Sequence, residues 1–443
     1  MPPWPSPRLA WYAVFVLATV LMLGTIENYL ITFLIQPIKR DFQLSDLEVS
    51  FLIGAAPAVF YACIGLPLAR MVDSVRRNRL LSIALGAAGI ATSLAGLTQQ
   101  FWQFAVCRMA VGGGGAISSP GTYSLLADYF PREKLTRAIA ALSVGLILGR
   151  SLMPVVAAAL VGLAGTWGVI HFARLVLHEW QLVFMMAGTL GLLGSVLMLT
   201  VKEPARRGRM SAAGKLPLSA VFGYVWQKRA LYLPMFLALA FYAVESLGIE
   251  LWRVEFLRRT YGWAPQTSGP ILGASTLVSS LTGLVIGTRV AEWLAKRYDD
   301  ANLRTVWLCL LILPVFATLA PLMPTPWHSI ACSSITAMLG MALTAPFNAA
   351  LQSVTPNEMR GQITAIYYLI FYAIGMGLGP TVMGFITDVV IGDENKIRYA
   401  MALCAGFMTP LAALSAWFGL RTYDGEIRDI KTRERMAMIG ESA

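Results

Sequence analysis

Charged residues are scarce in this sequence, and so are histidine and cysteine. Asp, Glu, Lys and Arg make up 13% of the 443 residues, whereas soluble domains carry roughly a quarter. The 3 histidines and 5 cysteines show neither metal-ligand spacing nor a pairing pattern. No Gly-x-x-x-x-Gly-Lys-Ser/Thr element for nucleotide binding is present in the sequence. We therefore predict no metal site, no cofactor, no ATP drive and no enzyme active site.

Long apolar stretches fill most of the chain instead. Hydrophobic residues make up 57% of it, and the mean hydropathy is +0.63. A helix needs about 20 predominantly apolar residues to span a membrane. We predict an all-α integral membrane protein in which the first stretch is an ordinary spanning helix, because it is too long for a signal peptide and no cleavage site follows it. The twelve predicted transmembrane helices are centred near residues 23, 59, 89, 113, 150, 191, 244, 280, 313, 340, 375 and 410.

Positive charge is concentrated on one side of these predicted helices. The net charge is +11, which would point to nucleic acid in a soluble protein. With the amino terminus inside, about 25 of the 35 Lys and Arg residues fall in alternate loops and tails on one side, and about seven on the other. This asymmetry predicts a multi-pass protein of the cell membrane (the inner membrane in a bacterium) with both termini cytoplasmic. The predicted partners of the basic surface are membrane lipids, not nucleic acid.

The longest polar segment, Lys202–Arg229, leaves six predicted spans on each side. The halves also resemble each other: Pro131 and Glu133 after the fourth span align with Pro356 and Glu358 after the tenth. Two six-helix repeats of this kind are typical of transporters whose substrate site lies near the midplane between them. The predicted domains are a six-helix bundle at 1–201, a cytoplasmic central loop at 202–230, a second six-helix bundle at 231–421 and a cytoplasmic tail at 422–443.

The stretch "AVCRMAVGGGGAISSP" at residues 105–120 contains four consecutive glycines. A phosphate-binding loop would require a Lys-Ser/Thr after the last glycine and a strand before the first, and neither is indicated. Small residues let membrane helices approach closely. We therefore interpret the glycines as a packing surface, which recurs at Gly145 and Gly149 and at Gly375 and Gly379.

Two charged residues fall inside predicted spans of the first half. At 1.5 Å per residue, Arg108 lies roughly 9 Å deep in the fourth span and Glu27 roughly 13 Å deep in the first. A charge within a span costs several kcal/mol unless it faces water or a partner. We predict that both side chains face one central cavity; the alternative is a structural ion pair that joins the two helices.

The seventh predicted span, "YAVESLGIELWRVEFLRR", carries further charges. Glu250 and Arg253 are three residues apart and are predicted to satisfy each other on one helix face. Glu245 has no basic residue three or four positions away, which makes it a second acidic candidate for proton coupling; the alternative is that these charges line an aqueous vestibule. Arg150 is a third cation within a span. Further candidate polar groups of the cavity are Tyr123, Tyr242, Tyr367 and Tyr368.

Residues 24–155 resemble the major facilitator superfamily, and more narrowly its Spinster-like branch. The resemblance is carried by "IQPIKRDFQLSDLEVSFLIGAAPAVFYACIGLPLARMVD" and "RMAVGGGGAISSPGTYSLLADYFPREKLTRA", and it extends over nearly the whole chain. Such proteins are proton-linked or facilitative carriers that work by alternating access, and animal members export lysolipids and sphingoid lipid phosphates. The resemblance implies two pseudo-symmetric six-helix bundles and a basic cytoplasmic turn, which matches here at Asp73 and Arg77.

The sequence departs from the pattern of this family at several positions. The usual Asp-Arg of the first helix is Glu27-Asn28, which keeps the acid and loses the adjacent cation. The usual Gly-Glu of the fourth helix is Gly114-Gly115, so an acid of the central cavity is missing. Glu27 or Glu245 would have to carry the proton instead; the alternative is a uniporter.

We therefore predict a secondary transporter that moves a small amphipathic solute, such as a lysolipid or lipid phosphate, and acts as a monomer. Glu27, Asn28 and Arg108 are the predicted substrate or proton contacts, with proton coupling through Glu27. The alternative is an organic-anion or drug carrier of a sister branch. The predicted cytoplasmic gate consists of Gly65, Asp73, Arg76, Arg77, Asp128 and Arg137.

Overall fold

The computed structural model describes residues 4–63, 75–172, 175–206, 218–356 and 358–441. Within these ranges, 11 helices are long and apolar enough to cross a membrane, and each contains the centre of one predicted span. The centre of the remaining predicted span lies in the 29-residue helix α6 (Phe101–Tyr129), which contains Arg108 and four consecutive glycines. The prediction of an all-α membrane protein is confirmed, and the helices are consistent with twelve spans.

The internal contacts of the chain divide it into two compact units. Unit 1 contains Met1–Arg209, Glu250–Leu277 and Pro380–Ile397, and unit 2 contains Met210–Ile249, Val278–Gly379 and Arg398–Ala443. Unit 1 therefore combines the first half of the sequence with two short segments of the second half. The domain bounds predicted from the sequence stay predictions.

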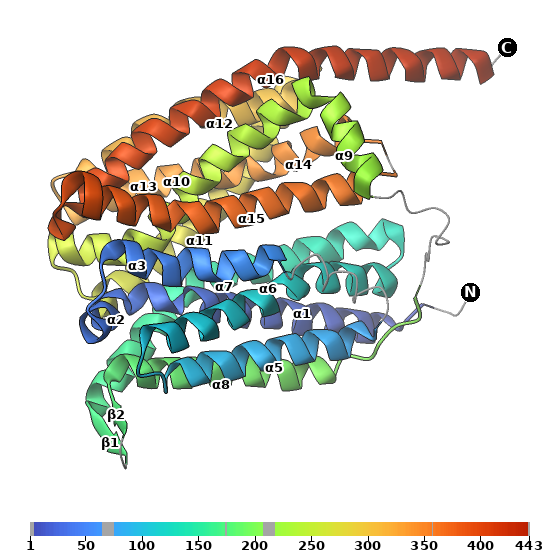
Figure 1. The fold of residues 1–443 in the computed structure, drawn as a ribbon. Helices are drawn as coiled ribbons and strands as arrows, with labels where there is room; N and C mark the ends of the chain where they lie inside the picture. Colours follow the sequence, from blue (N-terminus) through green and yellow to red (C-terminus); the bar gives the residue numbers. More distant parts are fainter. Residues whose placement is uncertain (1–3, 64–74, 173–174, 207–217, 357, 442–443) are drawn as a thin grey trace. The chain divides into compact units, whose positions relative to one another are not determined.

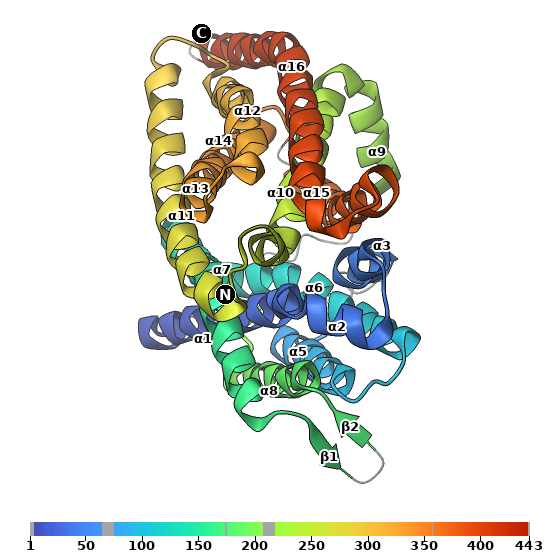
Figure 2. The same ribbon diagram turned by 90° about the vertical axis from the view of Figure 1, so that its left-hand side faces the viewer.

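Unit 1 is built mainly from helices that run along one another (Figure 1): α1 (Pro7–Tyr29), α5 (Arg77–Ala95), α6, α7 (Arg132–Trp167) and α8 (Glu179–Leu199). Between α1 and α5, the described residues form a 3₁₀ turn (Leu30–Phe33), α2 (Ile35–Phe42), α3 (Asp46–Ser50) and a π-helical turn (Phe51–Ala55). An antiparallel hairpin of β1 (Ile170–Phe172) and β2 (Leu175–Leu177) extends away from the helices of this unit (Figure 2).

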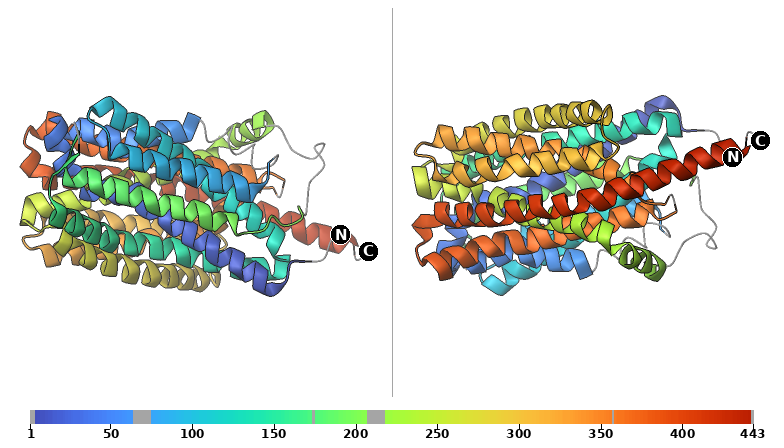
Figure 3. Two further views of the ribbon diagram at one scale, coloured as in Figure 1. Left: turned by 90° about the horizontal axis from the view of Figure 1, so that it is seen from below. Right: turned by 90° about the horizontal axis from the view of Figure 1, so that it is seen from above.

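Glycines let the helices of unit 1 approach closely. A Cβ atom at Gly188 of α8 would lie 2.4 Å from the carbonyl oxygen of Gly89 in α5, and these two helices lie side by side (Figure 3). In α6, a Cβ atom at Gly112 would lie 2.4 Å from the carbonyl oxygen of Pro57. Neither contact leaves room for a side chain, and the contact of Gly112 supports the interpretation of the glycine run as a packing surface.

Unit 2 has an apolar core of its own, in which Tyr232, Leu310 and Phe347 are fully buried. Its helices include α9 (Leu218–Gln227), α12 (Ala301–Leu319), α13 (Pro326–Ala342) and α14 (Thr344–Ser353), whereas α10 (Arg229–Tyr261), α11 (Pro265–Ala295), α15 (Arg360–Phe385) and α16 (Ile397–Glu441) contribute residues to both units. Figure 3 shows α16 as one long helix. Short 3₁₀ turns occupy Ala320–Leu322 and Glu394–Lys396, and a π-helical turn occupies Ile386–Ile391.

Candidate functional site

The carboxyl group of Glu27 lies inside unit 1, between three helices. Glu27 is 2% exposed on α1 and accepts a hydrogen bond from the Thr92 hydroxyl of α5. On the third side it faces Gly191 of α8, where a Cβ atom would lie 2.7 Å from Glu27 Oε2. The glycine therefore provides the room that this buried carboxyl group occupies.

Arg108 on α6 is 1% exposed and incompletely satisfied. Its Nη2 donates a hydrogen bond of 3.2 Å to the carbonyl oxygen of Asn28, but its Nε and Nη1 have no hydrogen-bond partner in the described part of the chain. The charges of Arg108 and Glu27 attract each other, yet the described residues show no ion pair between them. Buried polar groups are nearly always hydrogen-bonded, so these two nitrogens mark a place where a ligand or water can supply acceptors.

There is room for a methyl group at Gly115, beside Asn28 and two helical turns along α6 from Arg108. A Cβ atom at Gly115 would have the Asn28 Nδ2 atom, at 4.0 Å, as its nearest neighbour. Residues seven apart on an α-helix share a face, so Gly115 and Arg108 lie on the same side of α6. The prediction that Glu27 and Arg108 face a common cavity stays a prediction.

Arg150 forms an ion pair with Glu250, a residue of another helix. Arg150 Nη2 of α7 forms an ion pair with Glu250 Oε2 of α10, and both residues belong to unit 1. Arg253 lies within electrostatic range of both side chains. The Glu250 carboxylate therefore accepts from Arg150 of α7, a partner that helical spacing did not indicate. The predicted local pair of Glu250 and Arg253 stays a prediction.

The predicted residues of unit 2 form a separate group. The rings of Tyr367 and Tyr368 on α15 lie 4.6 Å apart, and Tyr242 of α10 packs against Phe371 with ring centroids 6.4 Å apart. Glu245, one turn after Tyr242, is 1% exposed, and its Oε2 has no hydrogen-bond partner among the described residues. These groups supply a buried carboxyl and an aromatic surface to unit 2.

Tyr123, the remaining predicted tyrosine, lies in α6 of unit 1 and is 40% exposed. It is therefore not buried with Glu27 and Arg108. Its role as a polar group of the cavity stays a prediction.

Two of the predicted gate residues meet in what we call the Arg77 network. Arg77, the first residue of α5, forms ion pairs with Asp128 at 2.6 Å and with Glu203 at 2.8 Å, and it donates to the Ser124 carbonyl oxygen at 2.9 Å. Arg77 is 2% exposed. Sequence reasoning missed Glu203, because it stands directly after an apolar span and resembles the start of the polar loop.

The other predicted gate residues lie outside this network. Arg76 and Arg137 are exposed on the surface of unit 1 and form no ion pair in the part of the chain that the structure describes. Gly65 and Asp73 lie outside the described residues. Their assignment to the gate stays a prediction.

A second group of ion pairs, the Asp46 network, has a buried centre and was not predicted at all. Asp46, at the start of α3, is 0% exposed and accepts from Arg259 of α10 at 2.6 and 2.9 Å and from Lys39 of α2 at 2.7 Å. Arg259 also pairs with Glu255, and Lys39 with Glu394. All five residues belong to unit 1.

The Arg77 network and the Asp46 network lie at opposite ends of the helices of unit 1. The helix α5 begins at one end of this unit, whereas α2 and α3 meet at the opposite end (Figure 1).

Comparison with known proteins agrees with this architecture. The chain matches the Major Facilitator Superfamily over residues 15–380. A similar solved structure is a bacterial homologue of the human lysosomal transporter Spinster, in an inward-facing and unoccupied conformation. The two chains are 24% identical with a TM-score of 0.77, and the match covers 96% of this chain and 95% of that one.

Related sequences are also those of transporters and spinster proteins. An MFS-type efflux pump of Mycolicibacterium smegmatis is 26% identical over 427 residues, which is 95% of each chain. Protein spinster homolog 1 of Xenopus laevis is 22% identical over 88% of this chain and 77% of its own length. Helices and relatives together define a multi-pass membrane transporter. The chain belongs to the Major Facilitator Superfamily, and its resemblance to the Spinster-like branch is confirmed.

Proposed function

We propose that this protein is a secondary transporter that moves an amphipathic organic anion by alternating access. The observation that supports the proposal is the buried guanidinium group of Arg108, two of whose nitrogens have no hydrogen-bond partner in the described chain. A buried donor left without a partner costs roughly 1–3 kcal/mol. A bound anion would offset this cost, since its oxygens supply the acceptors.

The two unpartnered nitrogens of Arg108 favour a headgroup with two or more oxygens. A planar guanidinium pairs with a carboxylate or phosphate through two parallel hydrogen bonds. Gly115, which has room for a methyl group, lies on the same face of α6 as Arg108, and we place the part of the solute that follows the headgroup beside it. The likeness to spinster proteins favours an apolar tail, and hence a lysolipid or a lipid phosphate.

Glu27 is the proposed proton carrier of unit 1. Its carboxyl group is buried within electrostatic range of Arg108. An anion bound at Arg108 would weaken the attraction between the Arg108 cation and the Glu27 carboxylate. Substrate binding would therefore change the proton affinity of Glu27, and this coupling links the two binding events. A uniporter would move its solute without this link.

The two ion networks are the proposed locks at the two ends of the transport path. Each joins segments that are distant in sequence: Arg77 to Glu203, and Asp46 to Arg259. Alternating access requires each end to open in turn. We assign the Arg77 network to the cytoplasmic end, as its basic surroundings predict, and the Asp46 network to the opposite end.

Binding at Arg108 is tested by ligand-dependent thermal stability. Lysophosphatidic acid, below its critical micelle concentration, should raise the Tm of the purified protein, whereas lysophosphatidylcholine and an aromatic carboxylate should raise it less. R108Q should abolish the shift, and the surface variant R289Q should retain it. Equal shifts with R108Q and wild type would contradict the assignment of Arg108, and a larger shift with the aromatic carboxylate would favour a small organic anion.

A further inference from the structure

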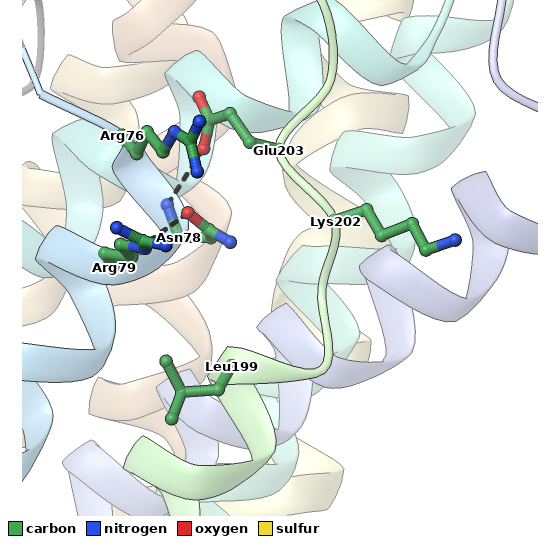
Figure 4. Close-up of a pocket in the computed structure, with 6 residues that line it drawn as sticks. All are labelled: Arg76, Asn78, Arg79, Leu199, Lys202 and Glu203. Atoms are coloured by element: carbon green, nitrogen blue, oxygen red, sulfur yellow. Dashed lines mark hydrogen bonds between the residues drawn. The ribbon is translucent and has the colours of Figure 1, made fainter.

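A pocket lies on the surface of unit 1, where α5 begins and α8 ends. Its volume is about 540 Å³. Figure 4 shows Arg76 and Arg79 on one side of it and Lys202 on the other. The lining residues are Arg76, Asn78, Arg79, Leu199, Lys202 and Glu203.

Three cations of this pocket are exposed. Arg76, Arg79 and Lys202 form no ion pair within the described residues. The one acid of the pocket, Glu203, is held away from these three cations, because its carboxylate accepts from Arg77 at 2.8 Å and from the backbone N–H of Asn78 at 3.0 Å. With three cations and one acid among its lining residues, the pocket presents an excess of positive charge to any molecule that enters it.

The shape of the pocket does not depend on these cations. The Asn78 side chain donates a hydrogen bond of 2.9 Å to the Val201 carbonyl oxygen, and Glu203 is held by Arg77 and by the start of α5. These bonds fix the segment after α8 against α5. The basic side chains thus surround a pocket that exists before a ligand binds.

A row of exposed apolar side chains extends from the pocket along α8. Leu199, which lines the pocket, is 58% exposed, and Val196 and Leu193 on the same face are 63% and 62% exposed. In a membrane protein such a surface faces lipid chains. The Tyr12 hydroxyl of α1 is hydrogen-bonded to Thr200 at 2.7 Å, and Trp11 beside it is 46% exposed. Exposed aromatic residues of this kind mark the level of the lipid headgroups.

We propose that this α5–α8 pocket binds the phosphate headgroup of an anionic diacyl phospholipid of the membrane, with its acyl chains along Leu199, Val196 and Leu193. The phosphate would accept hydrogen bonds from the guanidinium groups of Arg76 and Arg79, and Lys202 would add a third positive charge. The site is distinct from Arg108, so this lipid is a bound component of the protein surface and not its transported solute.

Native mass spectrometry of the protein released from mixed detergent and lipid micelles tests this site. Wild type should retain phosphatidylglycerol in preference to phosphatidylcholine of equal chain length. R76Q/R79Q/K202Q should weaken phosphatidylglycerol binding by at least about tenfold, since each cation near the surface attracts anionic lipid. The matched control R289Q/K296Q/R421Q removes three exposed cations from unit 2 and should bind like wild type.

Two further measurements make the result specific. R76K/R79K keeps the charges and should retain most of the lipid, and millimolar inorganic phosphate should not displace it if the acyl chains contribute. Equal loss in the pocket variant and its control would overturn the proposal, because it would show attraction by net charge alone. Displacement by free phosphate would overturn the acyl-chain part. Neither outcome depends on transport, so the proposed function is tested separately.

Discussion

Arg259 donates two hydrogen bonds to the carboxylate of Asp46, at 2.6 and 2.9 Å, although the two residues are 213 positions apart. Neither side chain reaches solvent, since Asp46 is 0% and Arg259 2% exposed. A capping box orients α3, because Ser45 accepts from the Glu48 backbone and Glu48 accepts from Ser45 in return. Asp46 is thereby held at the first position of the helix, where it meets Arg259.

Replacement of one partner of this pair should be costly. D46N leaves the Arg259 charge buried without its main partner, and removal of one partner of a buried pair typically costs about 3–5 kcal/mol. We expect a clearly lower Tm of D46N in detergent. A double-mutant cycle with R259M should give a coupling energy well above that of a surface pair. Additive effects of the two changes would contradict a direct interaction.

The Arg77 network allows the same test with an adjacent control. R77Q leaves the carboxylates of Asp128 and Glu203 facing each other without their shared cation, so we expect a loss of stability of about 3–5 kcal/mol. R76Q removes the same charge one residue earlier, at an exposed position, and should change stability by less than about 0.5 kcal/mol. Similar Tm values for the two variants would show that the network contributes little.

The sequence was sufficient for the membrane fold because hydropathy is a local property. Each spanning helix requires only that its own 20 or so residues be apolar, and this can be read without knowledge of the partners. Glu27 and Arg108 were identified for a related reason: a charge inside an apolar span must be buried or face water. Both are indeed buried.

The partners of these charges could not be read in the same way. Asp46 and Arg259 stand near the ends of apolar stretches, where a charge is ordinarily solvated, so nothing in the sequence marked them as buried. Helical spacing related Glu250 to Arg253, but it could not indicate the ion pair of Glu250 with Arg150, 100 positions away. Such pairings depend on which helices lie side by side, and a single sequence does not contain that information.

The glycines of α6 provide a test of how much room lies beside Asn28. G115A should fold as well as wild type, because the nearest atom to its methyl group would be 4.0 Å away. G112A should lose about 1–3 kcal/mol, since its methyl group would overlap the Pro57 carbonyl oxygen at 2.4 Å. These Tm values establish which position has room.

A larger side chain at the same position then tests function. G115F should fill the space that we assign to the solute and lower transport in proteoliposomes by tenfold or more, while Tm stays near the wild-type value. Because G115A leaves most of the space open, it should transport like wild type. Wild-type transport by folded G115F would place the solute elsewhere.

Glu27 is the residue whose titration we expect to couple transport to the pH gradient. E27Q preserves the shape of the side chain and its contact with Thr92 but removes its titration. In proteoliposomes with an imposed pH gradient, we expect E27Q to move the solute down its concentration gradient at a rate that no longer responds to the pH gradient. E245Q, which alters the buried carboxyl group of unit 2, is the matched control and should respond as wild type does.

The two variants separate three mechanisms. Loss of the pH response in E27Q alone assigns the proton to unit 1, where Glu27 lies within electrostatic range of Arg108. Loss in E245Q alone would move the proton site to unit 2 and remove the proposed link with Arg108. A wild-type protein that ignores the pH gradient would be a uniporter, and the burial of Glu27 against Thr92 and Gly191 would then be purely structural.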